Sequence, residues 1–223
     1  MTSMSEEEKT LFNKGLDELG ITLDSKQMDQ FSAYMQEIAL FNHKYRLVGA
    51  KGVDFVVKHL LDSLAPVNYF KSLVANNAKE LRFCDVGSGA GLPGIPLAIV
   101  FNETPFTLIE RSGRRAGFLR NAVAMCDLSL QVEVREQDLS EVRDTFDIIT
   151  FRAFHPLADI ITLLGMVLAE DGFVCAYKGR LEAIEEELRG LKAAWKSEII
   201  PLNVPFLDAS RNLCVLQKHI NMN

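Results

Sequence analysis

An alternation of short apolar runs with helical patterns begins at residue 81, and it constrains the fold more than any other feature of the chain. Apolar runs occupy residues 81–86, 106–109, 130–134, 146–151 and 172–177, and helical patterns fill the intervals at 94–100, 114–125, 156–168 and 181–195. Strands that alternate with helices predict a mainly parallel sheet covered by helices on both faces.

Two further apolar runs follow this alternation. Residues 198–202 and 213–217 are joined by a loop that contains Pro205, Asp208 and Ser210, with no helical pattern between them. A parallel crossover needs an intervening element, so we expect an antiparallel pair that closes the sheet. The expected fold class is α/β, with a Rossmann-like and mostly parallel sheet of about seven strands.

The first third of the chain has helical periodicity. Ser5 with Glu8 and Asp24 with Gln27 form capping-box patterns, and apolar residues recur at helical spacing after each of them. A third helix is expected over residues 53–64.

After Pro66, the polar stretch 71–80 separates this helical region from the strands. We therefore expect two parts: an N-terminal helical extension over residues 1–70, on the substrate side, and a ligand-binding Rossmann-like domain over residues 71–223.

The composition excludes several classes of protein. The 223 residues are 48% apolar and 24% charged, which rules out a disordered, collagen-like or disulfide-scaffold chain. Four cysteines lie far apart, without histidines at ligand spacing, and no apolar run approaches membrane-spanning length. The N-terminus is acidic where a signal peptide is cationic, so we expect a cytoplasmic protein with reduced cysteines. We also expect a monomer without a metal or a membrane segment.

A glycine-rich turn follows the first predicted strand. In the stretch 85–94, Asp85 precedes three alternating glycines, Gly87, Gly89 and Gly91. Glycines between a strand and a helix let the backbone approach a ligand closely. Residues 89–94 also satisfy G-x-G-x-x-G, so a nicotinamide-dependent oxidoreductase is one alternative.

Asp85 favours another ligand, because a carboxylate suits an ammonium group and repels a pyrophosphate. The pattern D-x-G-x-G-x-G resembles that of S-adenosylmethionine enzymes with a seven-stranded Rossmann-like fold.

Polar residues stand where the later strands end, which is the edge at which open parallel sheets bind ligands. Glu110 ends the second strand, where a carboxylate accepts hydrogen bonds from ribose hydroxyls. After the third strand come Gln137 and Asp138, which we expect beside adenine. Arg152 follows the fourth strand, and Lys178 and Gly179 follow the fifth.

From about residue 36 to residue 218 the chain resembles the small-subunit ribosomal RNA guanine-N7 methyltransferases, historically called glucose-inhibited division protein B. The resemblance rests on separated motifs: FNHKY at 41–45, KHLLDS at 58–63, DVGSGAGLPGIPL at 85–97, FRAF at 151–154, YKG at 177–179 and RNL at 211–213. The long glycine stretch with its attached LPGIP is far more specific than the glycines alone. The family pattern is broken at Phe41, commonly Trp, and at 46–48, usually Asn-Leu-Thr.

The resemblance implies S-adenosyl-L-methionine as cofactor and 16S ribosomal RNA, or the small ribosomal subunit, as partner. It assigns cofactor binding to Gly87, Leu92, Gln137, Asp138 and Arg152, with Glu110 on the ribose. Guanine N7 carries a free lone pair, so methyl transfer needs alignment and no general base. We expect Asn42 and His59 to hydrogen-bond the guanine edge, with Asp62 orienting the His59 ring.

The net charge of −6 argues against a nucleic-acid partner, but the distribution of the charges favours one. Residues 42–60 carry four basic side chains against one acid, and residues 111–120 carry four arginines and no acid. Acidic residues gather at 6–8 and 185–187, which we expect to be solvated. The expected RNA contacts are Lys44, Lys58, Arg114, Arg115, Lys178 and Arg211.

The expected function is methyl transfer to N7 of a guanine in 16S ribosomal RNA. Besides the oxidoreductase, two alternatives stay open: a methyltransferase that acts on another RNA or on a small molecule, and an RNA-binding module without catalysis.

Overall fold

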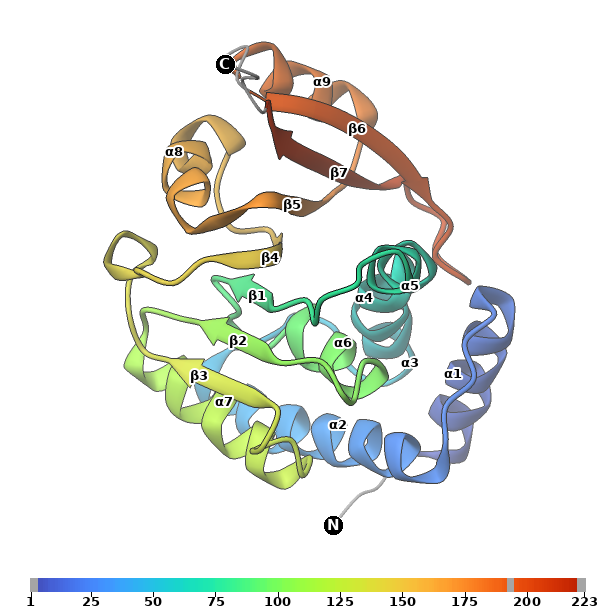
Figure 1. Ribbon diagram of the computed structural model, residues 1–223. Coiled ribbons are helices and arrows are strands. Elements are labelled where there is room, and N and C mark those ends of the chain that lie inside the picture. The colour runs from blue at the N-terminus through green and yellow to red at the C-terminus, as the bar shows by residue number, and fades with distance from the viewer. Residues whose placement is uncertain (1–3, 192–194, 220–223) are drawn as a thin grey trace.

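A sheet with the strand order β3-β2-β1-β4-β5-β7-β6 organises the protein, whose computed structural model describes residues 4–191 and 195–219 (Figure 1). Strands β1 to β5 are parallel, and β7 is antiparallel to both of its neighbours. The prediction of a mostly parallel, seven-stranded α/β sheet with an antiparallel closing pair is confirmed. The strands are β1 (Phe83–Val86), β2 (Phe106–Ile109), β3 (Val132–Arg135), β4 (Phe146–Arg152), β5 (Leu168–Lys178), β6 (Trp195–Leu202) and β7 (Arg211–Lys218).

The central strands are apolar on both sides because helices cover both faces of the sheet. Every residue of β1 is buried, and so are all residues of β4 except its last. The chain order reverses between β1 and β4, since β2 and β3 lie on one side and β5 on the other. Such a switch point opens a crevice outside the carboxyl ends of the strands.

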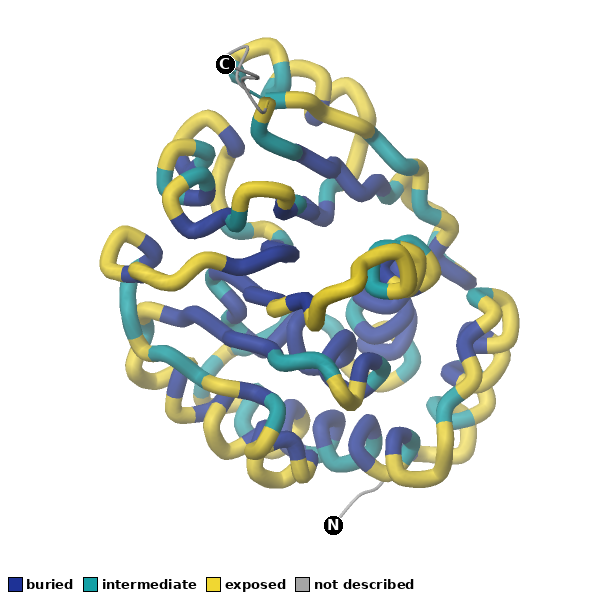
Figure 2. Tube along the Cα trace, in the orientation of Figure 1, coloured by how far each residue is buried: buried dark blue, intermediate teal, exposed yellow. Residues whose placement is uncertain are grey.

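Two hydrophobic clusters lie on the two faces of the sheet. One face carries α6 (Gly94–Val100) and α7 (Gly113–Met125), with α2 (Ser25–Tyr45) packed over them, while α1 (Glu6–Leu19) packs against the helical segment 53–61 (Figure 1). The other face carries η2 (Leu139–Glu141), α8 (Leu157–Val167) and α9 (Leu181–Arg189). In Figure 2 the central strands are mostly dark blue, and the outer turns of the helices are yellow.

The two N-terminal helices begin where the capping patterns predict. The Ser5 hydroxyl accepts a hydrogen bond from the backbone N–H of Glu8, and the Asp24 carboxylate accepts one from that of Gln27. In both caps the third helical residue returns a side-chain acceptor to the N-cap N–H, which satisfies a second backbone donor.

The predicted third helix is present, but its middle section is a π-helix. It consists of α3 (Val53–Phe55), η1 (Val56–Leu61) and α4 (Asp62–Leu64). Wider π turns occur frequently at functional sites, and here the π segment contains Lys58 and His59.

A further helix, α5 (Val67–Ala75), extends into the first half of the stretch 71–80 that was expected to be a polar separator. Its buried residues Val67 and Phe70 precede that stretch, and residues 71–80 themselves are exposed or half-buried. The expected boundary between residues 70 and 71 lies inside α5, and one hydrophobic cluster contains residues from both sides of it. The assignment of the helical part to the substrate side stays a prediction.

Buried hydrogen bonds fasten α2 to the backbone of the sheet domain. Gln27 Nε2 donates to the carbonyl of Ile99 at 2.8 Å, and Gln30 Nε2 donates to that of Cys126 at 2.8 Å. The Tyr34 hydroxyl donates to the carbonyl of Ala90, inside the glycine-rich turn, at 2.7 Å. The helical region is therefore in direct contact with the segment expected to bind the ligand.

The helix expected over residues 181–195 ends as α9 at Arg189, and Trp195 already belongs to β6. Residues 192–194 of that expectation lie outside the described residues. All four cysteines are free and buried, as small apolar residues are. Within the described ranges, no helix has both the length and the apolar character of a membrane span.

Candidate functional site

A cavity of about 800 Å³ lies at the carboxyl edge of the sheet, where the sequence predicts a ligand. It brings together ten of the expected site residues, from the glycine-rich turn, the π segment, the start of α4, the ends of β4 and β5, and the starts of α7 and β7. These are Gly87, Gly89, Leu92, Lys58, His59, Asp62, Arg115, Arg152, Lys178 and Arg211.

The turn needs glycine at two positions for different reasons. Gly87 has φ +66°, and a Cβ atom there would lie 2.2 Å from the Phe154 ring. Gly89 has φ +56°, and a Cβ atom there would meet nothing closer than the carbonyl oxygen of Gly87, at 3.7 Å. The backbone at Gly89 is therefore bare toward the cavity, which is the arrangement that a closely approaching ligand requires.

Gly91 serves packing, because a Cβ atom there would lie 2.5 Å from the Ile95 side chain. It does not line the cavity.

Glu110, which follows β2, holds the turn in place. Its Oε2 accepts from the N–H of Gly89 at 2.9 Å, and its Oε1 accepts from the N–H of Ser112 at 2.8 Å. The residue is only 5% exposed. Glu110 does not line the cavity, and both of its oxygens already accept backbone hydrogen bonds, so the expected ribose contact stays a prediction.

Asp85 lies beneath the turn and not on the cavity wall. Its Oδ1 accepts from the Thr150 hydroxyl at 3.1 Å, while its Oδ2 is buried without a hydrogen-bond partner. Burial raises the pKa of this carboxyl to about 7, against a smaller lowering by hydrogen bonds from neighbours such as Thr150. Because Asp85 does not line the cavity, its direct contact with a ligand amine stays a prediction.

Gln137 and Asp138 lie at the end of β3, outside the cavity lining. Asp138 caps η2: its carboxylate accepts from the Ser140 N–H at 3.0 Å and from the Ser140 hydroxyl at 2.8 Å. These hydrogen bonds lower the pKa of Asp138. The expected role of Gln137 and Asp138 beside adenine stays a prediction.

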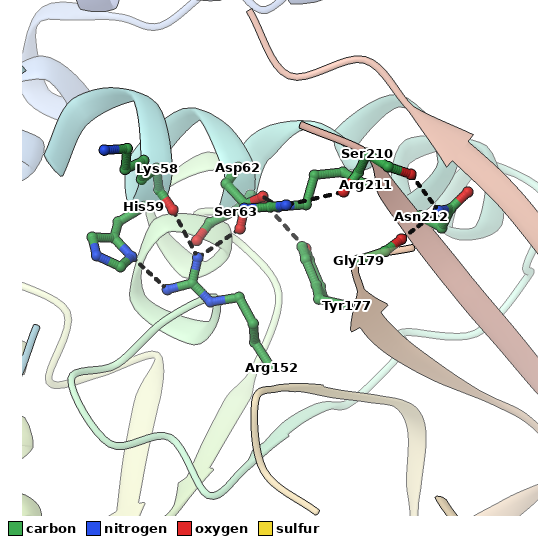
Figure 3. Close-up of polar contacts among 10 residues, drawn as sticks. All are labelled: Lys58, His59, Asp62, Ser63, Arg152, Tyr177, Gly179, Ser210, Arg211 and Asn212. Atoms are coloured by element: carbon green, nitrogen blue, oxygen red, sulfur yellow. Dashed lines mark hydrogen bonds and ion pairs between the residues drawn. The ribbon is translucent and has the colours of Figure 1, made fainter. Parts of the chain in front are cut away.

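A charged cluster joins the π segment to the ends of β4 and β7 (Figure 3). Arg152 Nη1 donates to Asp62 Oδ2 at 2.7 Å, and Arg211 Nε donates to Asp62 Oδ1 at 2.7 Å. Arg152 Nη2 lies 3.1 Å from His59 Nδ1. Next to this cluster the Tyr177 hydroxyl donates to the carbonyl of Ser63 at 2.8 Å.

This cluster corrects the expectation that Asp62 orients the His59 ring. Both carboxylate oxygens of Asp62 are used by the two arginines, and the partner of the ring is Arg152. Asp62 therefore holds the His59 ring in place through Arg152. Burial and the positive charge of Arg152 lower the pKa of His59 to about 4.

The expected guanine contact of Asn42 stays a prediction, because the structure gives its side chain backbone partners. Its amide donates to the carbonyl of Val48 and accepts from the N–H of Val48, both at 2.9 Å. Asn42 lines a separate cavity of about 260 Å³ between α1, α2 and α3. Because Val48 lines the larger cavity, Asn42 positions a segment of its wall.

The basic residues differ in how far they are paired. Lys58 pairs with Asp54 at 3.0 Å, and Lys178 pairs with Glu187 at 2.8 Å. Glu187 also accepts from the N–H of Leu157 and lines the cavity, so the expectation that all of 185–187 is a solvated face was wrong. Lys44 and Arg114 are exposed and outside the cavity lining.

Three residues of the site region were given no role from the sequence. Tyr34 and Phe154 contact the glycine-rich turn, and Glu187 neutralises Lys178. Phe154 belongs to the FRAF motif, and helical spacing places Glu187 three residues after the buried Ile184, on the same helix face.

Comparison with known proteins identifies relatives over most of the chain. The model of the family described as GidB, rRNA small subunit methyltransferase G, matches residues 27–214. The ribosomal RNA small subunit methyltransferase G of Borrelia turicatae (strain 91E135) is 32% identical over 210 residues, which cover 93% of this chain and 98% of that protein.

Solved structures share the fold at low identity. The magnesium protoporphyrin IX methyltransferase from Synechocystis PCC 6803, solved with bound SAM, has a TM-score of 0.56 and 19% identity, and the match covers 88% of this chain and 99% of that chain. The precorrin-6y C5,15-methyltransferase from Geobacter metallireducens GS-15 has a TM-score of 0.53 and 15% identity, over 78% of this chain and 91% of that chain.

Proposed function

Because the chain belongs to the rRNA small subunit methyltransferase G family, we propose that it transfers a methyl group from S-adenosyl-L-methionine to N7 of a guanine in 16S ribosomal RNA. One observation carries the proposal: the bare glycine turn and the basic cluster line the same cavity. A cofactor on the turn and a base against the basic wall would meet there. The proposal includes action in the cytoplasm, on the RNA or on the small subunit.

The residues at the turn fit this cofactor. Gly89 has no side chain where it lines the cavity, so a ligand can approach its backbone, and the Glu110 carboxylate accepts the hydrogen bond of the Gly89 N–H. The Oδ2 of Asp85 is buried beneath the turn without a hydrogen-bond partner, so a cationic sulfonium with its ammonium group would favour the charged form of this carboxyl, whereas a pyrophosphate would disfavour it. This is the reason for preferring S-adenosylmethionine over a dinucleotide.

Bound at the turn, the cofactor supplies an electrophilic methyl group. The task of the protein is alignment: Gly87, Gly89 and Leu92 line the same cavity as His59, Arg152 and Arg211. In the transfer, the N7 lone pair forms the new N–C bond while the C–S bond breaks and its electron pair stays on sulfur. No proton leaves N7, so no general base is required.

The proposal is tested with purified protein, S-adenosylmethionine carrying a labelled methyl group, and either 16S ribosomal RNA or small subunits. We expect label in one guanine, recovered as 7-methylguanosine. Label in another base, or in a small molecule only, would contradict the substrate assignment. Calorimetric binding of NAD in preference to S-adenosylmethionine would support the oxidoreductase instead.

A further inference from the structure

The contact between Arg152 and His59 fixes where the histidine carries its proton. Arg152 Nη2 lies 3.1 Å from His59 Nδ1. A guanidinium group has only N–H donors and keeps its charge in proteins, so Nδ1 must be the acceptor. A neutral imidazole with an unprotonated Nδ1 carries its hydrogen on Nε2.

The position of Arg152 is itself fixed by other contacts. Its Nη1 donates to Asp62 at 2.7 Å and to the carbonyl of Lys58 at 3.4 Å, and Asp62 is held from its other side by Arg211 (Figure 3). The ring also packs against Phe55, with centroids 5.3 Å apart. The ring orientation and its tautomer are therefore set before any ligand arrives.

His59 is also kept neutral. Burial is the main cause of its lowered pKa, and the positive charges of Arg152, Lys58 and Arg211 act in the same direction, while Asp62 opposes them. Its pKa of about 4 leaves the ring uncharged at neutral pH.

The remaining N–H is available to a ligand. The two ring nitrogens diverge, so Nε2 faces away from Arg152 (Figure 3). Among the described residues, none accepts a hydrogen bond from Nε2, and Nε2 is not one of the buried atoms left without a partner. Since His59 lines the large cavity, it presents there a neutral donor with a fixed direction.

We infer that His59 selects guanine over adenine by donating Nε2–H to the guanine O6 atom. This inference rests on the proposed function. Beside N7, guanine carries the O6 acceptor, and adenine carries an amino donor at the same position. A bond to O6 leaves the N7 lone pair free for the methyl group, whereas adenine would set donor against donor.

A neutral donor suits this reaction better than a charged one. Methylation at N7 gives the purine a positive charge, so an arginine, lysine or imidazolium on O6 would repel the forming product. The His59 N–H recognises the same acceptor without that repulsion.

The test replaces single atoms of the target base. Three RNAs carry, at the methylated position, guanosine, inosine (which keeps O6 and lacks the 2-amino group) or 2-aminopurine (which keeps N7 and lacks O6). The His59→Phe variant keeps an aromatic ring against Phe55 but has no donor. His219→Phe is the matched control, because His219 follows the end of β7 opposite to Arg211.

For guanosine and inosine we expect His59→Phe to lower kcat/KM by about 10- to 100-fold, the factor that base-edge hydrogen bonds typically give. For 2-aminopurine we expect wild type and His59→Phe to be equally slow, because the partner atom is already absent. Calorimetric affinity for S-adenosylmethionine should be unchanged in His59→Phe, which shows that the fold and the Arg152 wall persist. His219→Phe should match wild type throughout.

An equal loss on 2-aminopurine and guanosine would overturn the inference while the proposed function stands, and so would unchanged activity of His59→Phe on guanosine. A wild-type protein that methylates no guanosine in any of these RNAs would overturn both.

Discussion

Arg152 and Asp62, 90 residues apart in the chain, form an ion pair of 2.7 Å whose side chains are 17% and 4% exposed. The pair joins the end of β4 to the helical segment that precedes the sheet. Arg211 adds a second cation to the same carboxylate, so Asp62 connects three segments of the cavity wall.

Replacing this carboxylate should destabilise the fold. In Asp62→Asn, two partly buried arginines lose their counter-charge, and we expect a loss of about 1–3 kcal/mol in the free energy of unfolding. Urea denaturation at neutral pH measures it. Asp54→Asn is the control, since its ion pair with Lys58 is exposed and contributes at most about 0.5 kcal/mol. Equal effects of the two substitutions would show that the Asp62 cluster contributes no more than a surface pair.

Gly89→Ala should separate ligand binding from stability. The new methyl group meets no protein atom closer than 3.7 Å but projects toward the space proposed for the cofactor, so we expect at least a ~10-fold loss of affinity for S-adenosylmethionine. The fold should lose only the cost of the left-handed backbone, about 1 kcal/mol. Gly20→Ala, with φ +65° and open space, controls for that cost. Wild-type affinity in Gly89→Ala would remove the turn from the binding site.

Glu110→Ala should weaken cofactor binding more than it weakens the fold. It frees the N–H groups of Gly89 and Ser112 and removes the proposed ribose acceptor, and charged hydrogen bonds of this kind correspond to about 10- to 100-fold in affinity. Isothermal calorimetry with S-adenosylmethionine measures it. Glu136→Ala, which removes an exposed pair with Arg120, should bind normally. Unaltered binding by Glu110→Ala would exclude the carboxylate from the site.

Asp85 predicts a pH dependence of stability. Its pKa is raised to about 7 from 3.8, so between these values the unfolded chain has released the proton while the folded chain keeps it. Stability therefore falls as pH rises through this window and levels off above it. In Asp85→Asn this fall should be absent, so the variant gains stability relative to wild type as the pH increases from 4 to 8. Urea denaturation at both pH values, with Asp127→Asn as an exposed control, measures the difference. A pH-independent difference would contradict the assignment.

The exposed arginines of α7 should contribute to RNA affinity through phosphate contacts. In Arg114→Ala or Arg115→Ala, the slope of log K against log salt should decrease by about 0.7, the contribution of one contact to single-stranded RNA. Filter binding of 16S ribosomal RNA at several salt concentrations measures the slope. Lys71→Ala, on exposed α5 surface, should leave it unchanged. Slopes that match wild type in both arginine variants would place the RNA elsewhere.

The sequence correctly predicted those features that depend on residues close together in the chain, such as helix starts and the glycine-rich turn. The capping pairs Ser5 with Glu8 and Asp24 with Gln27 begin their helices as expected, and the stretch from Asp85 to Gly94 forms the expected turn. Alternating runs also predicted the sheet and its closing pair, because burial on two faces leaves a strong apolar signal.

The site could be predicted only where it depends on strand ends. The place of Arg152 in the site could be predicted because it lies at the carboxyl end of β4. Its ion pair with Asp62 could not, because that pair depends on which distant segments of the chain lie next to each other. The π turn that contains His59 has the same apolar spacing as an ordinary helix, so no pattern distinguishes it. Asn42 belongs to one of the family motifs, but its side-chain amide donates a hydrogen bond to the carbonyl of Val48. That hydrogen bond depends on how the chain folds back after α2, which no motif indicates.

The hydrogen bond from Tyr34 to the carbonyl of Ala90 joins α2 directly to the glycine turn. Under the proposed function, a shift of α2 on RNA binding would reach the turn through this bond, and a shift of the turn would reach α2. Thermodynamic linkage makes the effect reciprocal: the factor by which the RNA changes cofactor affinity equals the factor by which the cofactor changes RNA affinity. Removing one phenolic oxygen, in Tyr34→Phe, would therefore reduce both factors together.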